Sequence, residues 1–418
     1  MDRLIRILDF VRGSAKLVAT GNRAYYAWLA FLGLLILVGL AGYTHQFNAG
    51  LIATNMRDQV SWAFYVGNFT FLVGVAAAAV LLVIPAYVYN WGPIKEVVIL
   101  GELLAISAIT MCLLFIAVDM GRPDRALHIM PLLGSPNWPR SLLTWDALVL
   151  NLYLILNVSI VSIVLYKGYR GEHYNKKIVV PLVLFSIPAA VSIHTVTAFL
   201  YNGMASRPYW NASILAPRFI ASAFCSGPAV MLILFQVLRK TTKIDIKDEA
   251  IHKIAELMSY AMFINLFLLG AEVFKEYYSA TEHLVFTQYL WSGIGEHKAL
   301  VPFAWLALAC NLISFFLFLV PKSRKSFVGL NVGCLLIWAG CYIEKGMGLV
   351  IPGMTPDTLG EIYEYRPTAT EWSVAAGVFG VGFLVFTVLV KVAVPILTGT
   401  FQTRAAEHAA EATPALAP

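Results

Sequence analysis

Long apolar segments separated by short polar ones dominate the pattern of the chain. A transmembrane helix needs about 20 predominantly apolar residues to cross roughly 30 Å of hydrocarbon. The segments that meet this requirement are 25–43, 62–89, 95–118, 142–166, 178–201, 213–238, 254–274, 299–320, 326–348 and 372–397. The pattern therefore predicts an all-α integral membrane protein with ten transmembrane helices.

The composition is typical of an integral membrane protein. Hydrophobic residues make up 59% of the chain and charged residues 13%, and the mean hydropathy is +0.73, all outside the usual range of soluble proteins. The net charge of +6 is interpreted as a signal of topology, because no segment interleaves aromatic and basic residues as a nucleic-acid surface would. We expect no nucleic-acid partner.

The distribution of basic residues predicts the orientation in the membrane. Most of the Lys and Arg residues, such as Arg12, Lys176 and Lys240, fall in segments that share one side with the N-terminus. By the positive-inside rule both termini are then cytoplasmic. The longer loops lie on the outer side, where a partner protein is expected to dock. These loops are 44–61, 119–141, 202–212, 275–298 and 348–371.

A weak internal repeat suggests two helical bundles. Spans two to five and spans six to nine each begin on the outer side, and the second helix of each set ends with an acid, Asp119 or Glu272. This predicts two four-helix bundles, with spans one and ten at the periphery. The expected divisions are a cytoplasmic segment 1–24, the first span and loop 25–61, the first bundle 62–201, the second bundle 202–348, a loop and last span 349–398, and a disordered cytoplasmic tail 399–418.

The cysteines narrow the chemistry by exclusion. All five fall within predicted spans, and none belongs to a C-x-x-C pair or a C-x-x-C-H haem-attachment motif. Walker sequences and glycine-rich phosphate loops are also absent from the sequence. We therefore expect no haem, no iron–sulfur cluster and no metal in this chain.

Ionisable residues in or at the ends of the spans mark a candidate site. A charge at membrane depth is costly, so such residues usually have a function. Asp119 ends the third span and His194 lies in the outer half of the fifth, while Asp146, Tyr201 and Arg218 are expected near the same level. A carboxylate, an imidazole, a phenol and a guanidinium at one depth would suit a small ligand with a polar head.

The register of the fifth helix supports this site, and two simpler interpretations remain open. Four polar residues are spaced so that they share one stripe, which is expected to face the bundle interior: Ser186, His194, Thr197 and Tyr201. In the simpler interpretations, His194 only contacts a helix carbonyl, and Asp119 pairs with Arg122 at the membrane boundary.

Three stretches of the sequence resemble a known family. The segment 119–130, DMGRPDRALHIM, looks like the D-x-G-R-P-x-R motif of the polysulfide reductase membrane-subunit family, also called NrfD-like. The stretches HTVTAFLYNGMASRPYW from His194 and APRFIASAF from Ala216 are similar to its ten-helix branch, found in alternative complex III and in the menaquinone reductase complex of sulfate-reducing bacteria. The segment 141–146, SLLTWD, departs from the S-P-M-S-W-G of shorter members, so the resemblance does not fix the role of Asp146.

The resemblance implies a function for the candidate site. Members of this family bind menaquinone or a similar quinone in the first bundle near the outer face, which would make Asp119 and His194 the acid and imidazole of the site. Tyr201, Arg218 and Asp146 would be further contacts. The resemblance also implies electron exchange with a periplasmic iron–sulfur subunit, accompanied by molybdopterin-family-like and multihaem cytochrome c subunits, as in anaerobic sulfate respiration.

Protons taken from the cytoplasm would need polar steps through the membrane, since uptake from that side makes the reaction electrogenic. The candidate steps are Glu102, Ser107, Thr110 and Ser186 in the first bundle and Glu256, Glu272 and Glu344 in the second. Each could instead form a packing hydrogen bond or lie at the membrane boundary. A proton-coupled secondary transporter and a passive membrane anchor remain alternative functions; the transporter is disfavoured because matched Gly/Pro interruptions are not seen in the two halves.

Overall fold

The computed structural model describes residues 2–89, 91–95, 97–129 and 133–403. Ten helical spans in this part of the chain are long and apolar enough to cross a membrane, which confirms the predicted all-α membrane fold. The helices of these spans are α2 (Arg23–Ala49), α3 (Phe64–Ala76) with α4 (Ala78–Val83), α6 (Val98–Asp119), α7 (Leu142–Tyr169), α8 (Lys176–Asn202), α9 (Leu215–Thr241), α10 (Asp248–Ser279), α12 (Val301–Leu319), α14 (Phe327–Lys345) and α16 (Ala369–Leu397).

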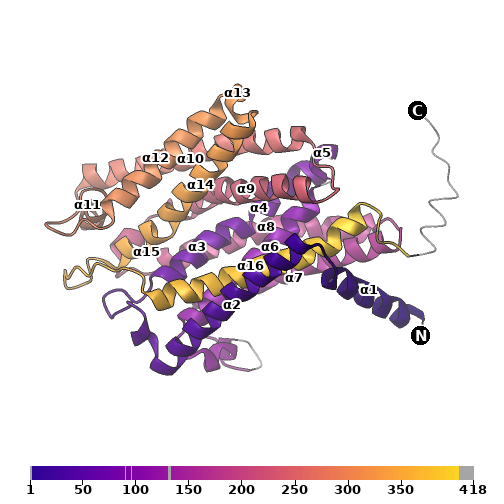
Figure 1. The fold of residues 1–418 in the computed structure, drawn as a ribbon. Helices are drawn as coiled ribbons and strands as arrows, with labels where there is room; N and C mark the ends of the chain where they lie inside the picture. The colour runs from indigo at the N-terminus through magenta and orange to yellow at the C-terminus, as the bar shows by residue number, and fades with distance from the viewer. Residues whose placement is uncertain (1, 90, 96, 130–132, 404–418) are drawn as a thin grey trace.

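Shorter helices lie before, between and beside the spans. They are α1 (Asp2–Ala19), η1 (Leu51–Ala53), η2 (Ile84–Val88), α5 (Gly92–Lys95), η3 (Pro123–Ile129), η4 (Pro208–Trp210), α11 (Leu284–Trp291), α13 (Pro321–Arg324) and α15 (Met347–Met354). The long connections, described over 50–63, 120–129, 133–141, 203–214, 280–300 and 355–368, share one end of the molecule, here called the long-loop end. The N-terminal helix α1 and the last described residues lie at the opposite, short-loop end (Figure 1).

The spans form the two predicted bundles. In the first, α3 packs against α6 and α7 packs against α8; in the second, α9 packs against α10 and α12 packs against α14. The bundles meet where α9 contacts α3, α4 and α8. Gly227 of α9 permits this contact, because a Cβ there would come within 2.4 Å of the Ala78 Cβ. Small residues at such crossings let membrane helices pack closely.

The first and last spans pair at the periphery, as predicted. Helix α2 packs along α16, and α16 in turn covers α6. The crossing is formed by two glycines, since a Cβ on Gly39 would lie 2.4 Å from the Cα of Gly377. The Trp28 indole also donates a hydrogen bond of 3.0 Å to the Thr387 hydroxyl. Only 11% of the apolar window of α2 is buried, so this helix mostly faces lipid.

Two details of the predicted spans are wrong. The segment 62–89 is not one regular helix: α3 ends at Ala76, α4 follows, and the chain then forms the π-helical turn η2. Pro85 lies in that turn and lacks the amide hydrogen that a regular helix needs. Glu272 does not end its helix, because α10 continues to Ser279. Residues 404–418, most of the predicted tail, lie outside the described residues.

Candidate functional site

Asp119 closes α6 at the long-loop end, beside polar side chains of two other helices. The Gln46 amide donates to the Val118 carbonyl at 2.7 Å and accepts from the Tyr65 hydroxyl, also at 2.7 Å. Gln46 and Tyr65 are buried, and the Oδ1 atom of Asp119 is buried without a hydrogen-bond partner. Arg122 pairs with Asp124 at 2.9 Å, so the geometry does not favour the boundary pairing with Asp119.

A second buried carboxylate, Glu371 at the start of α16, lies within electrostatic range of Asp119. It accepts hydrogen bonds from the backbone amides of Asn55 and Thr368 at 3.0 and 2.9 Å and from the Tyr365 hydroxyl. Burial and the nearby Glu371 carboxylate raise the pKa of Tyr365, so the phenol keeps the proton it donates. Glu371 therefore connects the loop 50–63 to the start of α16, within electrostatic range of Asp119.

The polar stripe of α8 is buried, as its spacing predicts. Thr197 donates to the Oδ1 atom of Asp146 at 2.7 Å, which joins α8 to α7. The Tyr201 and Thr70 hydroxyls share a 2.5 Å hydrogen bond, which joins α8 to α3. Asp146 is 0% exposed, and its Oδ2 atom has no hydrogen-bond partner. Ser186, lower on the same stripe, donates to the Val183 carbonyl at 2.7 Å.

Tyr201 interacts electrostatically with two acids of the first bundle, Asp119 and Asp146. Its ring is held by Trp62 and Trp210, with ring centroids 5.8 and 5.0 Å away. We call Asp119, Asp146 and Tyr201 the acid–tyrosine group, because the structure gathers these three of the five predicted contacts.

His194 is buried nearby but is set apart from that group. Its Nδ1 atom lies 3.1 Å from the Ala190 carbonyl, which is the helix contact expected in the simpler interpretation. Its Nε2 atom, however, is buried and has no partner. A cavity of about 10 Å³ adjoins the residue, between Val80 of α4 and Phe224 of α9. Across the described residues, no hydrogen bond or ion pair joins His194 to the acid–tyrosine group.

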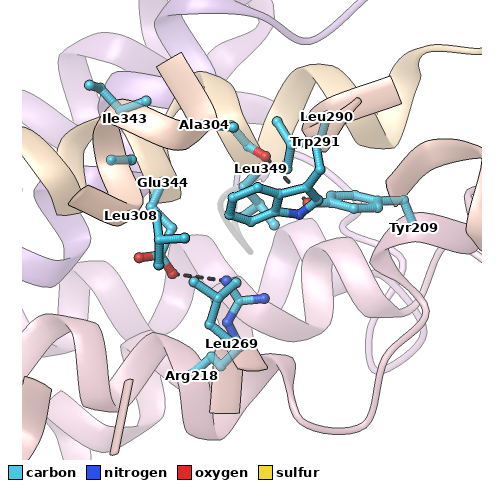
Figure 2. A pocket seen from close by; sticks show the side chains of 12 residues that line it. Tyr209, Arg218, Leu269, Leu290, Trp291, Ala304, Leu308, Ile343, Glu344 and Leu349 are labelled. Atoms are coloured by element: carbon cyan, nitrogen blue, oxygen red, sulfur yellow. Dashed lines mark hydrogen bonds and ion pairs between the residues drawn. The ribbon is translucent and has the colours of Figure 1, made fainter. Parts of the chain in front are cut away.

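Arg218 belongs to a separate ion network in the second bundle. Its guanidinium pairs with Glu272. It also pairs with Glu344 at 2.8 Å (Figure 2). Lys345 lies 3.2 Å from the same Glu344 carboxylate. Asn265 and Asn311 donate to its other oxygen at 3.2 and 2.8 Å. The structure therefore brings Arg218 together with the acids of the second bundle and not with Asp119.

A small cavity of about 30 Å³ lies beside this network. Figure 2 shows its apolar walls, with Tyr209 and Trp291 on one side and the Arg218–Glu344 pair on the other. Burial raises the pKa of Tyr209 to about 12, so this phenol stays protonated. Its hydroxyl donates to the Gly348 carbonyl at 3.4 Å.

The candidate proton steps differ in their surroundings. Glu102 is 2% exposed, and neither of its carboxylate oxygens has a hydrogen-bond partner. Ser107 and Thr110 donate to carbonyls one turn back in α6, at 2.9 and 2.8 Å. Glu256 is partly exposed near the short-loop end, where it lies 3.3 Å from Lys253 and 3.4 Å from Arg324. Among the candidate proton-carrying acids, Glu102 is therefore the one whose carboxylate oxygens both lack a hydrogen-bond partner among the described residues.

Sequence reasoning missed several residues of these networks. Gln46 had a visible signal, because it is an amide near the end of an apolar span. Lys345 directly follows Glu344 and could also have been noticed. Tyr65 and Thr70 had no such signal, since single hydroxyls are common in membrane helices and only the fold shows which of them meet a partner.

A third cavity, of about 190 Å³, lies between the last turns of α2 and the segment 120–124, which follows Asp119 directly. Gln46 lines it from α2, and Gly121 lines it from the segment. The long-loop end thus combines buried polar atoms that lack partners, on Asp119 and Asp146, with an open space beside Asp119.

Comparison with known proteins extends over most of the chain. A family model described as polysulphide reductase, NrfD, matches residues 52–355. The chain is 26% identical over 392 residues to a putative dimethyl sulfoxide reductase membrane subunit of Halobacterium salinarum, covering 86% of this chain and 88% of that relative.

Two further relatives have names that mention a quinone or quinol. An Hdr-like menaquinol oxidoreductase integral membrane subunit of Archaeoglobus fulgidus is 24% identical over 383 residues, covering 88% of this chain and 92% of its own. The integral membrane subunit of the menaquinone reductase of Nitratidesulfovibrio vulgaris is 20% identical over 393 residues, covering 86% and 89%. The similarity therefore spans whole membrane helices in both bundles.

Proposed function

The chain belongs to the polysulphide reductase NrfD family, and on this premise we propose that it is the quinone-binding membrane subunit of a respiratory oxidoreductase complex. The proposed quinone is menaquinone, in keeping with the names of two relatives. The complex would lie in a bacterial inner membrane, with both termini cytoplasmic and the long-loop end outside. The first bundle, within 62–201, would hold the quinone site, and the second, within 202–348, would support it.

The observation that carries this proposal is the set of unpartnered buried atoms in the first bundle. Asp119 Oδ1, Asp146 Oδ2 and His194 Nε2 all lack a hydrogen-bond partner among the described residues. Buried polar groups without partners are costly, and they are kept where a ligand or a proton uses them. A bound quinone supplies two-electron redox chemistry and two oxygens that hydrogen-bond and exchange protons, which fits these atoms.

The residues of the acid–tyrosine group have distinct proposed roles. Asp119 holds and releases a proton at its open oxygen, since a carboxyl group can act as an acid or a base. Tyr201 orients that end of the site through its hydroxyl, which is already fixed by Thr70. Asp146 is held in place by Thr197 and keeps one oxygen free. His194 offers its Nε2 atom deeper in the bundle, and an imidazole can either donate or accept.

Electrons would come from, or go to, a partner docked on the long loops. We propose a periplasmic iron–sulfur subunit there, together with molybdopterin-family-like and multihaem cytochrome c subunits. Protons would be taken up from the short-loop end through Glu102, whose two oxygens are unpartnered. This uptake would couple the quinone reaction to charge movement across the membrane.

Electron transfer in the purified complex tests the proposal. Asp119→Asn and His194→Ala should each lower the rate with a short-chain menaquinol analogue at least about tenfold, because each removes a group that would exchange or stabilise a proton. Ser192→Ala is the matched control on the same helix, since Ser192 is partly exposed and donates to the Pro188 carbonyl of its own helix at 2.7 Å. Unchanged rates for both site variants in a fully assembled complex would leave only a transporter or an anchor role.

A further inference from the structure

The cavity beside Asp119 has two unlike walls. Three residues of α2 line it at helical spacing, so they share one face, and the residue that caps the helix continues this wall: Tyr43, Gln46 and Phe47, followed by Gly50. The opposite wall is the segment 120–124. We propose that this cavity is the port through which the quinone ring enters from the lipid, and that Gln46 is the positioning residue between the port and Asp119. This inference rests on the proposed function.

The size and position of the cavity suit a quinone ring. An enclosed apolar protein cavity of roughly 150 Å³ holds one benzene ring, and this open cavity, which the Arg122–Asp124 ion pair lines in part, measures about 190 Å³. It therefore has room for one ring of the bicyclic menaquinone head at a time. The Tyr43 and Phe47 rings, with centroids 6.3 Å apart, form an aromatic wall, and Phe47 is 61% exposed. Because α2 is mostly unburied along its apolar window, a lipid-soluble ring reaches the port sideways from the bilayer.

The two other cavities described above are too small for this role. The space beside His194 measures about 10 Å³ and the one beside Arg218 about 30 Å³. Neither holds even one aromatic ring without movement of its walls. The quinone ring therefore has its best entry next to Asp119.

Gln46 is placed to guide a quinone oxygen. Its side-chain nitrogen carries two hydrogens, one of which is used on the Val118 carbonyl. Its side-chain oxygen is occupied by the Tyr65 hydroxyl, so the amide cannot rotate freely. The second hydrogen is then available to a ligand in the cavity that Gln46 lines. Val118 directly precedes Asp119, so this contact would hold the quinone oxygen beside the acid.

Photolabelling of the native complex tests the port. A menaquinone analogue that carries an azide on its ring should label peptides containing residues 43–51 and 120–124, and excess unlabelled analogue should suppress that labelling. Competed labelling confined to α4, α8 and α9 around His194 would overturn the port but leave the proposed function standing. If no residue of this chain shows competed labelling, both the port and the proposed function fail.

A side chain that fills the cavity gives a second test. A Cβ at Gly121 would meet only the Leu51 side chain, at an ordinary 3.6 Å, so Gly121→Phe should extend into open space. We expect the KM for a short-chain quinol analogue to rise about tenfold, equivalent to about 1.4 kcal/mol of binding. The matched control is Gly33→Phe on α2, where a Cβ would meet nothing within 4 Å. An unchanged KM for Gly121→Phe overturns the port; if that variant does not assemble, Gly121→Leu is measured and interpreted in the same way.

The positioning role of Gln46 has its own readout. Gln46→Leu should lower kcat more than it raises KM, because the ring still enters but its oxygen is no longer held beside Asp119. Tyr65→Phe should also lower kcat more than it raises KM, but by a smaller factor, since it frees the Gln46 amide without removing it. Equal kcat and KM to the native complex in both variants would contradict the role.

Discussion

The two four-helix bundles treat buried charge in opposite ways. In the second bundle, the carboxylates of Glu272 and Glu344 face the cation of Arg218, and Lys345 adds a second cation at 3.2 Å. In the first bundle, Asp119 and Asp146 each keep a buried oxygen without a partner, and so does Glu102 with both of its oxygens. The carboxylates of the second bundle thus have cationic partners, although Arg218 Nε and Lys345 Nζ lack hydrogen-bond partners, whereas the first bundle leaves carboxylate oxygens open to a ligand and to protons.

This difference separates structural from functional acids. Buried ion pairs cost desolvation energy and persist when every member is satisfied. Unsatisfied buried acids are the ones that mark function, because nothing in the fold offsets their burial. We therefore interpret the paired acids of the second bundle as structural and the unpartnered acids of the first bundle as functional.

The largest expected effect on stability comes from breaking the second-bundle network. Arg218→Met should lower the free energy of unfolding by about 3–5 kcal/mol, because it leaves two buried carboxylates short of a cation. Thermal unfolding of the purified complex in detergent measures this. The double variant Arg218→Met with Glu344→Gln should recover part of the loss; no recovery would contradict a paired network.

A smaller loss is expected in the first bundle when a single donor is removed. Thr197→Val keeps the shape of the side chain but deletes the 2.7 Å hydrogen bond to Asp146. The cost should be about 1–3 kcal/mol, because a buried acceptor loses its partner. Thr195→Val is the matched control, since Thr195 bonds only within its own helix, to Val191 at 2.9 Å. Equal stability of the two variants would show that Asp146 does not depend on Thr197.

At Glu102 we expect a substitution to leave the free energy of unfolding unchanged or to raise it. Glu102→Gln should leave the protein as stable or raise its stability by about 1 kcal/mol, because the native carboxylate has no partner to lose. Proton uptake linked to quinone turnover should nevertheless slow. A stopped-flow pH indicator in proteoliposomes measures this uptake, and a normal uptake rate would remove Glu102 from the proposed route.

The smallest effect is expected at Glu256. Its ion pairs with Lys253 and Arg324 are partly exposed, so Glu256→Gln should cost roughly 0–1 kcal/mol. Its proton uptake should match that of the native complex in the same proteoliposome assay. A large loss of uptake would show that the second bundle also conducts protons.

Much of the fold could be predicted because membrane helices are encoded locally. Apolar length predicted all ten spans, and spacing along α8 predicted the buried stripe from Ser186 to Tyr201. The family could also be identified from residues 119–130, and the match to its model confirms that identification.

The partners of the site residues could not be predicted, for a physical reason. Depth along a helix follows from sequence position, but the direction of a side chain around a bundle depends on contacts between distant segments. Arg218 lies near the predicted level, yet it faces Glu272 and Glu344 of the second bundle. Gln46 reaches Val118 across 72 residues of sequence, and Glu371 reaches Asn55 across 316.

The most direct test of the contrast compares one variant from each bundle in the same assay. Asp119→Asn and Lys345→Met are introduced separately, and quinol-linked electron transfer is measured per assembled complex, with Asp58→Asn, an exposed acid of the same end, as the control. We expect at least about a tenfold loss of rate for Asp119→Asn with normal stability, and for Lys345→Met lower stability with a rate close to native. A native rate in assembled Asp119→Asn, together with a lost rate in assembled Lys345→Met, would place the chemistry in the second bundle and contradict a quinone site in the first.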